Sequence, residues 1–196
     1  GFKLDVRFFD KNIPMPIPFL GECNIYNALA AMATSWSFGV EPDDIKRGIM
    51  NAKLLANRFE IIEYEGIVII NDSYNANPGS MNEALKVLAN YKCEGRHFFI
   101  VGDMLELGDL AESAHKSLGE DVARYSIDYL VSVGELSAHV TQSAVAAGMN
   151  KKNTATASGY ECAVAFIKKY SRPGDCLLVK GSRGSKMEEI IRLLVA

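Results

Sequence analysis

The sequence has few cysteines, and their arrangement predicts neither a metal site nor a redox pair. The four cysteines lie far apart, form no C-x-x-C motif and have no closely spaced histidine, which excludes the usual zinc-binding spacings. Isolated cysteines of this kind are typical of buried thiols in a reducing compartment, so we expect a cytoplasmic protein. We predict a buried thiol at each of four positions: Cys23, Cys93, Cys162 and Cys176.

Long apolar runs and basic blocks are also missing. No stretch approaches the ~20 apolar residues of a membrane-spanning helix, and the start, GFKLDVRFFD, lacks the cationic and apolar regions of an export signal. Lys and Arg number 21 against 24 Asp and Glu, giving a net charge of −3 without any basic block that could neutralise a nucleic-acid backbone. We therefore expect neither a membrane nor nucleic acid as a partner.

The first part of the chain predicts short strands and two helices. Alternating apolar residues and three prolines within residues 1–20 favour edge strands. An apolar stripe that begins near Asn24 predicts a helix, and Pro42 suits the first turn of a second one. Two apolar runs separated by Glu65-Gly66, at residues 59–64 and 67–71, predict a β-hairpin.

After the polar stretch NDSYNANPGSM, strands and helices alternate, which predicts an α/β fold: a Rossmann-like domain with a mostly parallel sheet. Ser80 and Glu83 have the spacing of a capping box for the first of these helices. Strands are expected at residues 97–101, 128–133, 153–156 and 176–180, with helices at about 110–125, 135–147, 158–170 and 185–195.

Three of the predicted strands run directly into glycine, at Gly102, Gly134 and Gly181. Ligands of open α/β sheets bind beyond the carboxyl ends of the strands, so these turns form a candidate binding rim. The last turn, Lys180–Lys186, places three cations among small residues before a helix and could hold an anion. It is not a Walker loop, because the G-x-x-x-x-G-K-[ST] pattern is absent.

Other candidate residues each have a simpler structural interpretation. Asn24 and Asn27 share a helix face and could hold a base or ribose, or cap the helix and face solvent. Arg58 and Asp72 could serve phosphate and ribose, or be a surface arginine and a turn aspartate. The apolar loop residues Met104, Leu105 and Leu107 could contact a substrate or another domain, or their own core. His115 lies on an apolar helix stripe, which predicts a buried, hydrogen-bonded side chain.

Five segments together resemble the muramyl (Mur) ligases of bacterial cell-wall synthesis: GECNIYNALAA, ANRFE, NDSYNANPGSM, VGDMLELG and LLVKGSRGSKMEE. The resemblance runs in order from about residue 12 to the end. It is greatest to the branch that adds D-alanyl-D-alanine to the UDP-N-acetylmuramoyl-tripeptide. The Asp-Asn-Pro-Arg motif of the branch that adds the diamino acid does not occur.

The resemblance implies two domains: residues 1–72 as the end of the central ATP-binding domain, and 73–196 as a Rossmann-like C-terminal domain. It also implies a hinge at Ser73–Gly79. The family's ligases phosphorylate the terminal carboxylate of the substrate with ATP, and the amine of the incoming dipeptide then attacks the acyl phosphate. Closure of the final domain would exclude water from that intermediate.

Site roles carried over from the family fall into three groups. The nucleotide is expected at Asn24 and Asn27 on the adenine side, and at Arg58, Asp72, Tyr74 and Asn75. Catalytic roles are expected for Asp103 and Lys180, and dipeptide binding for Ser182 and Arg183. Departures from the family are Cys23 in place of a histidine, Asn71 in place of an aspartate, and Ala56-Asn57 in place of Pro-Gly.

The resemblance implies ATP and Mg²⁺ as cofactors, with the phosphate loop, the magnesium-binding glutamate and the modified lysine upstream of residue 1. We therefore expect a monomeric chain that is inactive alone, with the UDP-linked tripeptide and D-alanyl-D-alanine as partners of the parent ligase. Two alternatives are a folylpolyglutamate synthase-like ligase, disfavoured by VGDMLELG and the Lys-Gly-Ser-Arg-Gly segment, and a non-catalytic Rossmann-like binding module.

Overall fold

The computed structural model describes residues 1–8 and 11–196. The chain divides into two compact units, Gly1–Leu55 and Ala56–Ala196. This division differs from the boundary predicted at residue 72. Which part of a larger enzyme each unit represents stays a prediction.

The first unit pairs a two-stranded sheet with two helices. Strands β1 (Phe2–Phe8) and β2 (Lys11–Ile17) are antiparallel, and helices α1 (Cys23–Ser37) and α2 (Pro42–Asn51) follow. The expected strands and both helices are present. Apolar residues at alternate strand positions and on one stripe of each helix form the core, because each element turns one apolar face inward. This core contains Met15, Ile17, Ala28, Met32, Ile45 and Ile49.

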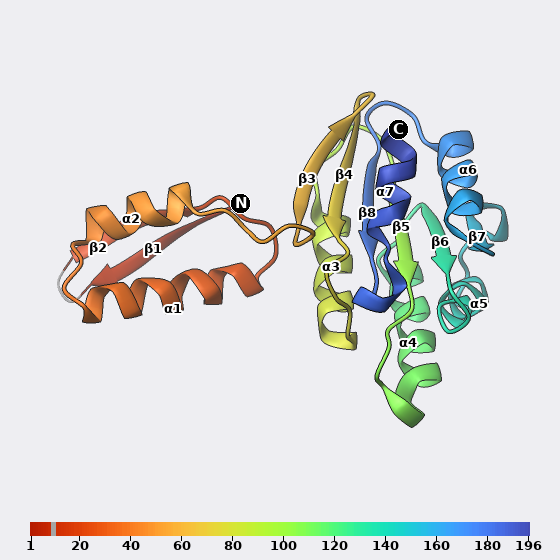
Figure 1. Ribbon diagram of the computed structural model, residues 1–196, viewed down its shortest axis with the longest axis horizontal. Helices are drawn as coiled ribbons and strands as arrows, with labels where there is room; N and C mark the ends of the chain where they lie inside the picture. The colour runs from red at the N-terminus through yellow and green to blue at the C-terminus, as the bar shows by residue number, and fades with distance from the viewer. Residues whose placement is uncertain (9–10) are drawn as a thin grey trace. The chain divides into compact units, whose positions relative to one another are not determined.

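The second unit is built on a six-stranded sheet with the order β3-β4-β8-β5-β6-β7. Only β3 is antiparallel to its neighbour; the other pairs are parallel. In Figure 1 the parallel arrows point the same way, so their carboxyl ends share one edge. The predicted α/β fold with a mostly parallel sheet is confirmed. The strands are Glu60–Tyr64, Ile67–Asp72, His97–Gly102, Tyr129–Val133, Thr154–Ala157 and Cys176–Lys180 for β3 to β8.

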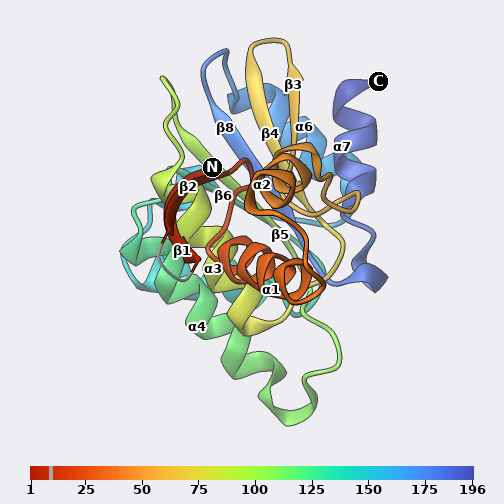
Figure 2. The same cartoon turned by 90° about the vertical axis from the view of Figure 1, so that its left-hand side faces the viewer.

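Helices cover both faces of this sheet, as Figure 2 shows. Helices α6 (Tyr160–Tyr170) and α7 (Glu188–Val195) pack on one face, where their apolar side chains join those of Phe98, Ile100 and Val179 in a single core. The opposite face carries α3 (Pro78–Asn90), α4 (Ala111–Arg124) and α5 (Ala138–Ala146). On this face α4 packs against both α3 and α5. Continuous burial of the central strands explains their unbroken apolar sequences.

Residues 73–79, predicted to be a hinge, lie within the second unit. The preceding strand β4 pairs along its length with β8, so this segment connects β4 to α3 and does not join the compact units. The cap of α3 also differs from the prediction. Asn77 caps the helix, accepting a bond from the Ser80 backbone N–H, while the Ser80 hydroxyl accepts one from the Asn77 N–H.

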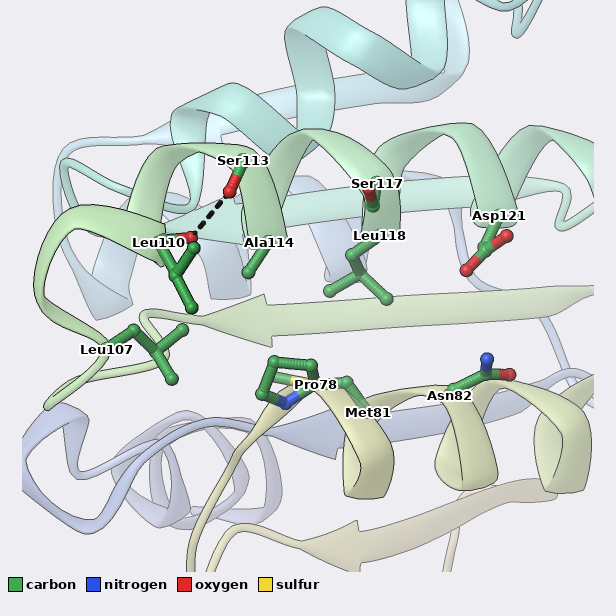
Figure 3. A pocket seen from close by; sticks show the side chains of 10 residues that line it. All are labelled: Pro78, Met81, Asn82, Leu107, Leu110, Ser113, Ala114, Ser117, Leu118 and Asp121. Atoms are coloured by element: carbon green, nitrogen blue, oxygen red, sulfur yellow. Dashed lines mark hydrogen bonds between the residues drawn. The ribbon is translucent and has the colours of Figure 1, made fainter.

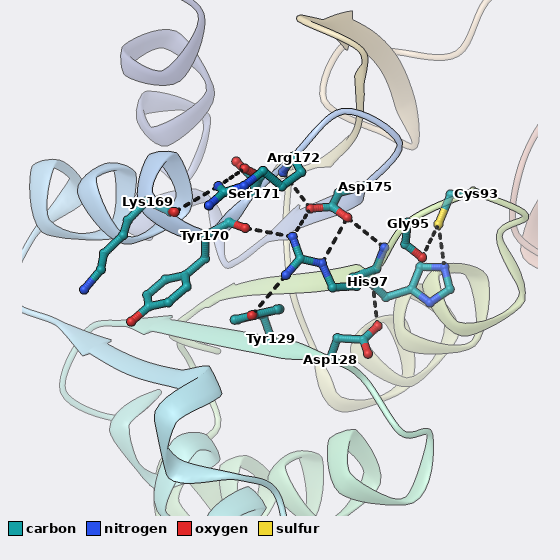
Figure 4. A network of polar contacts seen from close by, with 11 residues as sticks. Cys93, Gly95, His97, Asp128, Tyr129, Lys169, Tyr170, Ser171, Arg172 and Asp175 are labelled. Carbon is teal, nitrogen blue, oxygen red and sulfur yellow. Dashed lines mark hydrogen bonds and ion pairs between the residues drawn. The ribbon is translucent and has the colours of Figure 1, made fainter.

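The amino edge of the sheet is held by a polar network around Asp175 (Figure 4). Its carboxylate, 1% exposed, accepts bonds from the Arg96 backbone and guanidinium and from the backbone N–H of Arg172. Arg96 also donates to the Tyr129 hydroxyl and to the carbonyl of Tyr170. A buried carboxylate needs such partners, and this network joins β5, β6 and the turn before β8.

The cysteine prediction is correct only in part. Cys176 is buried and Cys93 is half-buried, but Cys23 and Cys162 are exposed. Both exposed thiols lie near helix starts on faces that the apolar stripes do not include. Among the helices of the described residues, none combines the length and apolar character that a bilayer crossing requires.

Candidate functional site

Charged side chains lie at the carboxyl edge where β8 is flanked by β4 and β5. Asp72, at the end of β4, is level with Lys180 at the end of β8, and Lys180 is level with Val101 of β5. The helices that follow β4 and β5 cover one face, whereas the helix after β8 covers the other. Such a reversal between neighbouring strands opens a crevice where ligands of α/β sheets bind.

Lys180 is enclosed at this point and is only 2% exposed. Its ammonium lies 2.5 Å from Asp72 Oδ2 and donates to the carbonyl of Asn75 at 2.9 Å, with the Asp72 carbonyl 3.5 Å away. An ammonium has three N–H groups, and all three have an acceptor here. The arrangement ties the segment after β4 to β8. A catalytic role for Lys180 stays a prediction.

Asp72 is 6% exposed, and burial raises the pKa of its carboxyl above the ordinary value. The charge and hydrogen bond of Lys180, the backbone N–H of Phe59 and the charge of Arg58 act in the opposite direction. The positive charges of Lys180 and Arg58 favour the ionised carboxylate, but the loss of hydration disfavours it more strongly, so the pKa is raised.

Arg58 sits in a strained turn. Asn57 and Phe59, on either side of it, have positive φ angles of 63° and 46°, a conformation that costs energy for residues other than glycine. The turn is fastened to β4: Asn71 Nδ2 donates to Asn57 Oδ1 at 2.9 Å, and the Tyr74 N–H donates to the Asn57 carbonyl at 3.0 Å. The side chain of Arg58 is exposed and lies 4.3 Å above the Tyr74 ring.

The sequence-based site did not include Asn57 or assign a role to Asn71. Asn71 is 4% exposed, and its Oδ1 accepts bonds from the hydroxyl and N–H of Ser73. One signal was available in ANRFE, because asparagine is enriched among residues with positive φ. Its partner, Asn71, could not be found that way because the pairing spans the hairpin.

Ser182 and Asp103 fasten the loops around β8. The Ser182 hydroxyl donates to the Ala76 carbonyl and accepts from the Leu105 N–H, and its own N–H donates to the Asp103 carbonyl. Asp103 Oδ1 accepts from the Ser137 N–H at 2.7 Å. These bonds hold the segments after β4, β5 and β8 in fixed positions relative to one another. The proposed substrate contacts of Ser182 and Asp103 are untested.

The rim glycines have packing roles. A side chain at Gly102 or Gly181 would overlap Met187, which is fully buried. At Gly134, with φ 123°, a Cβ atom would lie 2.3 Å from Asp103 Oδ1. At all three positions a neighbouring side chain lies so close to the backbone that only glycine fits.

The expected burial of His115 is confirmed: it is 0% exposed and lies between two backbone groups. Its Nε2 accepts from the Met104 N–H and its Nδ1 lies 2.6 Å from the Ala111 carbonyl, which fits the neutral imidazole. Met104 is in the core, whereas Leu105 is 40% exposed. The loop after β5 therefore packs on the core of its own unit through Met104, while Leu105 is exposed to solvent.

Arg183 and Asn75 are exposed at the same edge. Asn75 contributes its carbonyl to Lys180, and Arg183 lies 5.2 Å above the Tyr74 ring. The structure thus brings together eight of the ten predicted site residues in the second unit. The other two, Asn24 and Asn27, lie on α1 of the first unit. Asn24 is buried and is not the helix cap, and Asn27 Nδ2 donates to its Oδ1.

A groove of about 330 Å³ lies between α3 and α4 (Figure 3). Apolar side chains form most of its wall, and the amide oxygen of Asn82 is buried there without a hydrogen-bond partner. Its lining is Pro78, Met81, Asn82, Leu107, Leu110, Ser113, Ala114, Ser117, Leu118 and Asp121. Within the described residues, no cluster of His, Cys, Asp and Glu side chains could hold a metal ion.

Comparison with known proteins gives the family. Residues 57–183 match the Mur ligase, glutamate ligase domain. The chain is 38% identical over 195 residues to the UDP-N-acetylmuramoyl-tripeptide–D-alanyl-D-alanine ligase of Escherichia coli, covering 98% of this chain and 41% of that protein.

Solved structures agree. MurF from Acinetobacter baumannii matches with a TM-score of 0.83 and 29% identity, over 95% of this chain and 41% of that one. MurF from Thermotoga maritima in complex with ADP has the same fold, with a TM-score of 0.81 and 20% identity over 98% of this chain and 42% of that one. The chain spans about two fifths of the length of these relatives. It belongs to the Mur ligase family, and its second unit contains that family's glutamate ligase domain.

Proposed function

We propose that this chain forms the C-terminal part of a ligase that joins D-alanyl-D-alanine to a UDP-N-acetylmuramoyl-tripeptide in peptidoglycan synthesis, in the cytoplasm. The observation that carries the proposal is the similarity to a ligase of that name over 98% of this chain. ATP activates the tripeptide carboxylate as an acyl phosphate, and the dipeptide amine displaces the phosphate.

We assign separate roles to the residues that would bind the nucleotide and to those at the rim. Arg58 is exposed beside Asp72 and the Tyr74 ring, so it suits nucleotide phosphates, while Asp72 serves ribose. Asn75 lies at the same edge of the sheet. Asn24 and Asn27 belong to the first unit and are proposed to contact adenine. Asp103, Lys180 and Ser182 fix the rim that faces the reacting ends. Mg²⁺ would compensate the charge of the phosphates.

The test is ligation by the complete gene product that contains this chain. Incubated with the UDP-linked tripeptide, D-alanyl-D-alanine and ATP, it should form the pentapeptide product, measured by mass spectrometry together with phosphate release. Omitting any one substrate should abolish the product. The 196-residue chain alone should give none, because it contains no Walker-type phosphate loop.

Three results would contradict the proposal. Glutamate addition to a folate would indicate the folylpolyglutamate synthase-like alternative, and absence of any ligation by the complete gene product would favour a binding module. Robust turnover by the 196-residue chain alone would refute the dependence on upstream segments.

A further inference from the structure

Two arginines that are distant in the sequence share one aromatic ring. The guanidinium of Arg58 lies 4.3 Å from the centroid of Tyr74, and that of Arg183 lies 5.2 Å from it. Arg58 comes from the turn before β3, and Arg183 begins the short helix Arg183–Ser185 after β8. The attraction of an exposed guanidinium to an aromatic ring is weak, and the two like charges repel each other.

Carboxylates compensate the positive charge of this pair only at a distance, through the interaction of Arg58 with Asp72. In the described part of the chain, neither guanidinium forms an ion pair with a carboxylate. The carboxylate of Asp72 forms its ion pair with Lys180. Both arginines are exposed and Tyr74 is half-buried. The surface therefore presents two planar cationic groups next to one aromatic ring.

Hydrogen bonds hold the backbone segments that carry Arg58 and Arg183. The strained turn that carries Arg58 is held by Asn71 and by the Tyr74 N–H. Arg183 follows Ser182, whose hydroxyl and N–H bind the two neighbouring loops. Pre-positioned groups bind a ligand without first losing conformational freedom.

We propose that Arg58 and Arg183 form a clamp for a phosphoryl group, with Tyr74 as its platform. This rests on the proposed function and assigns Arg183 to the phosphate side, in place of the dipeptide carboxylate. A phosphoryl group carries up to two charges and several oxygens, so it can satisfy two forks at once. A single carboxylate would leave one of the two cations uncompensated.

The test is titration of the 196-residue chain with inorganic pyrophosphate at low ionic strength, followed by calorimetry or amide chemical shifts. Arg58→Gln and Arg183→Gln should each weaken binding about tenfold, the scale of one lost charge-assisted contact. Tyr74→Leu should weaken it as well, whereas Tyr74→Phe, which keeps the ring, should restore it. Arg192→Gln, which removes an exposed arginine paired with Glu189 on α7, should change binding less than twofold.

Three outcomes would overturn the clamp. One is an equal loss in Arg183→Gln and Lys186→Gln. Lys186 is a neighbouring cation outside the proposed clamp, so equal losses would indicate that pyrophosphate responds to diffuse positive charge. Another is D-alanyl-D-alanine binding that depends on Arg183 while pyrophosphate binding does not. The third is no pyrophosphate binding at low salt. Because the assay needs no ligation, its failure is distinguishable from failure of the proposed ligase activity.

Discussion

Lys180 and Asp72 compensate each other's charge inside the protein, at 2% and 6% exposure. Removing one partner of a buried pair leaves the other without compensation, which typically costs about 3–5 kcal/mol. We expect Lys180→Met to lower the free energy of unfolding by that amount in urea titrations, and Asp72→Asn in the same chain to recover part of the loss.

A matched control is the ion pair of the exposed Arg124 with the half-buried Asp121, where Arg124→Gln should cost at most about 1 kcal/mol because water screens the arginine's charge. If Lys180→Met is no more harmful than Arg124→Gln, the ammonium does not organise the rim.

Cys176 gives a prediction for alkaline pH. Burial raises the pKa of its thiol from 9.0 to about 12, with smaller contributions from Cys93 and Asp175. Above pH 9 the unfolded chain loses this proton while the folded chain keeps it, so stability present below pH 9 is lost as the pH rises toward 12. The unfolding free energy of the wild type, relative to Cys176→Ala, should fall by up to about 1.4 kcal/mol per pH unit in that interval. A pH-independent difference between the two proteins would refute it.

Two connections depend on glycines for different reasons: Gly134 follows strand β6, and Gly148 follows helix α5. Gly134 and Gly148 both have positive φ, at 123° and 107°, but a Cβ atom at Gly134 would overlap Asp103, whereas nothing lies within 4 Å of one at Gly148. Both alanine variants strain the backbone. Gly134→Ala should also displace the carboxylate from the Ser137 N–H and cost roughly 1–3 kcal/mol more, the usual range for overpacking. Thermal unfolding of the two variants compares them directly, and equal losses would exclude a role for that overlap.

Most elements were predictable from local sequence, but their ends were less so. The helix stripe from Asn24 carries a clear period, which reports the buried face. The unbroken apolar runs that became β5, β6 and β8 indicate strands covered on both faces. The α3 cap was misplaced because Ser80-Glu83 and Asn77-Ser80 both have the spacing of a capping box. Only the backbone geometry at Asn77, φ −147° and ψ 167°, decides between them.

At the scale of the whole chain, the division into compact units between Leu55 and Ala56 predicts which truncated chains fold. A chain that begins at Ala56 keeps β4 beside β8 and β3 beside β4, so it should unfold cooperatively and keep the circular dichroism of an α/β fold. A chain that begins at Ser73 lacks both strands and leaves Lys180 without Asp72, so it should be unstable or aggregate through the bared edge of β8. A stable chain from Ser73 would support the boundary predicted at residue 72.

The sequence by itself determined the fold class, the order of the elements, and the segments that carry the family resemblance, because periodicity and short motifs are local properties. The tertiary structure decided where the compact units divide, because β4 joins a strand more than 100 residues later. It also decided which cations are available: pairing across the sheet buries Lys180 against Asp72 and leaves Arg58 and Arg183 exposed on one ring. No local pattern encodes that choice, since burial depends on which distant strand ends meet.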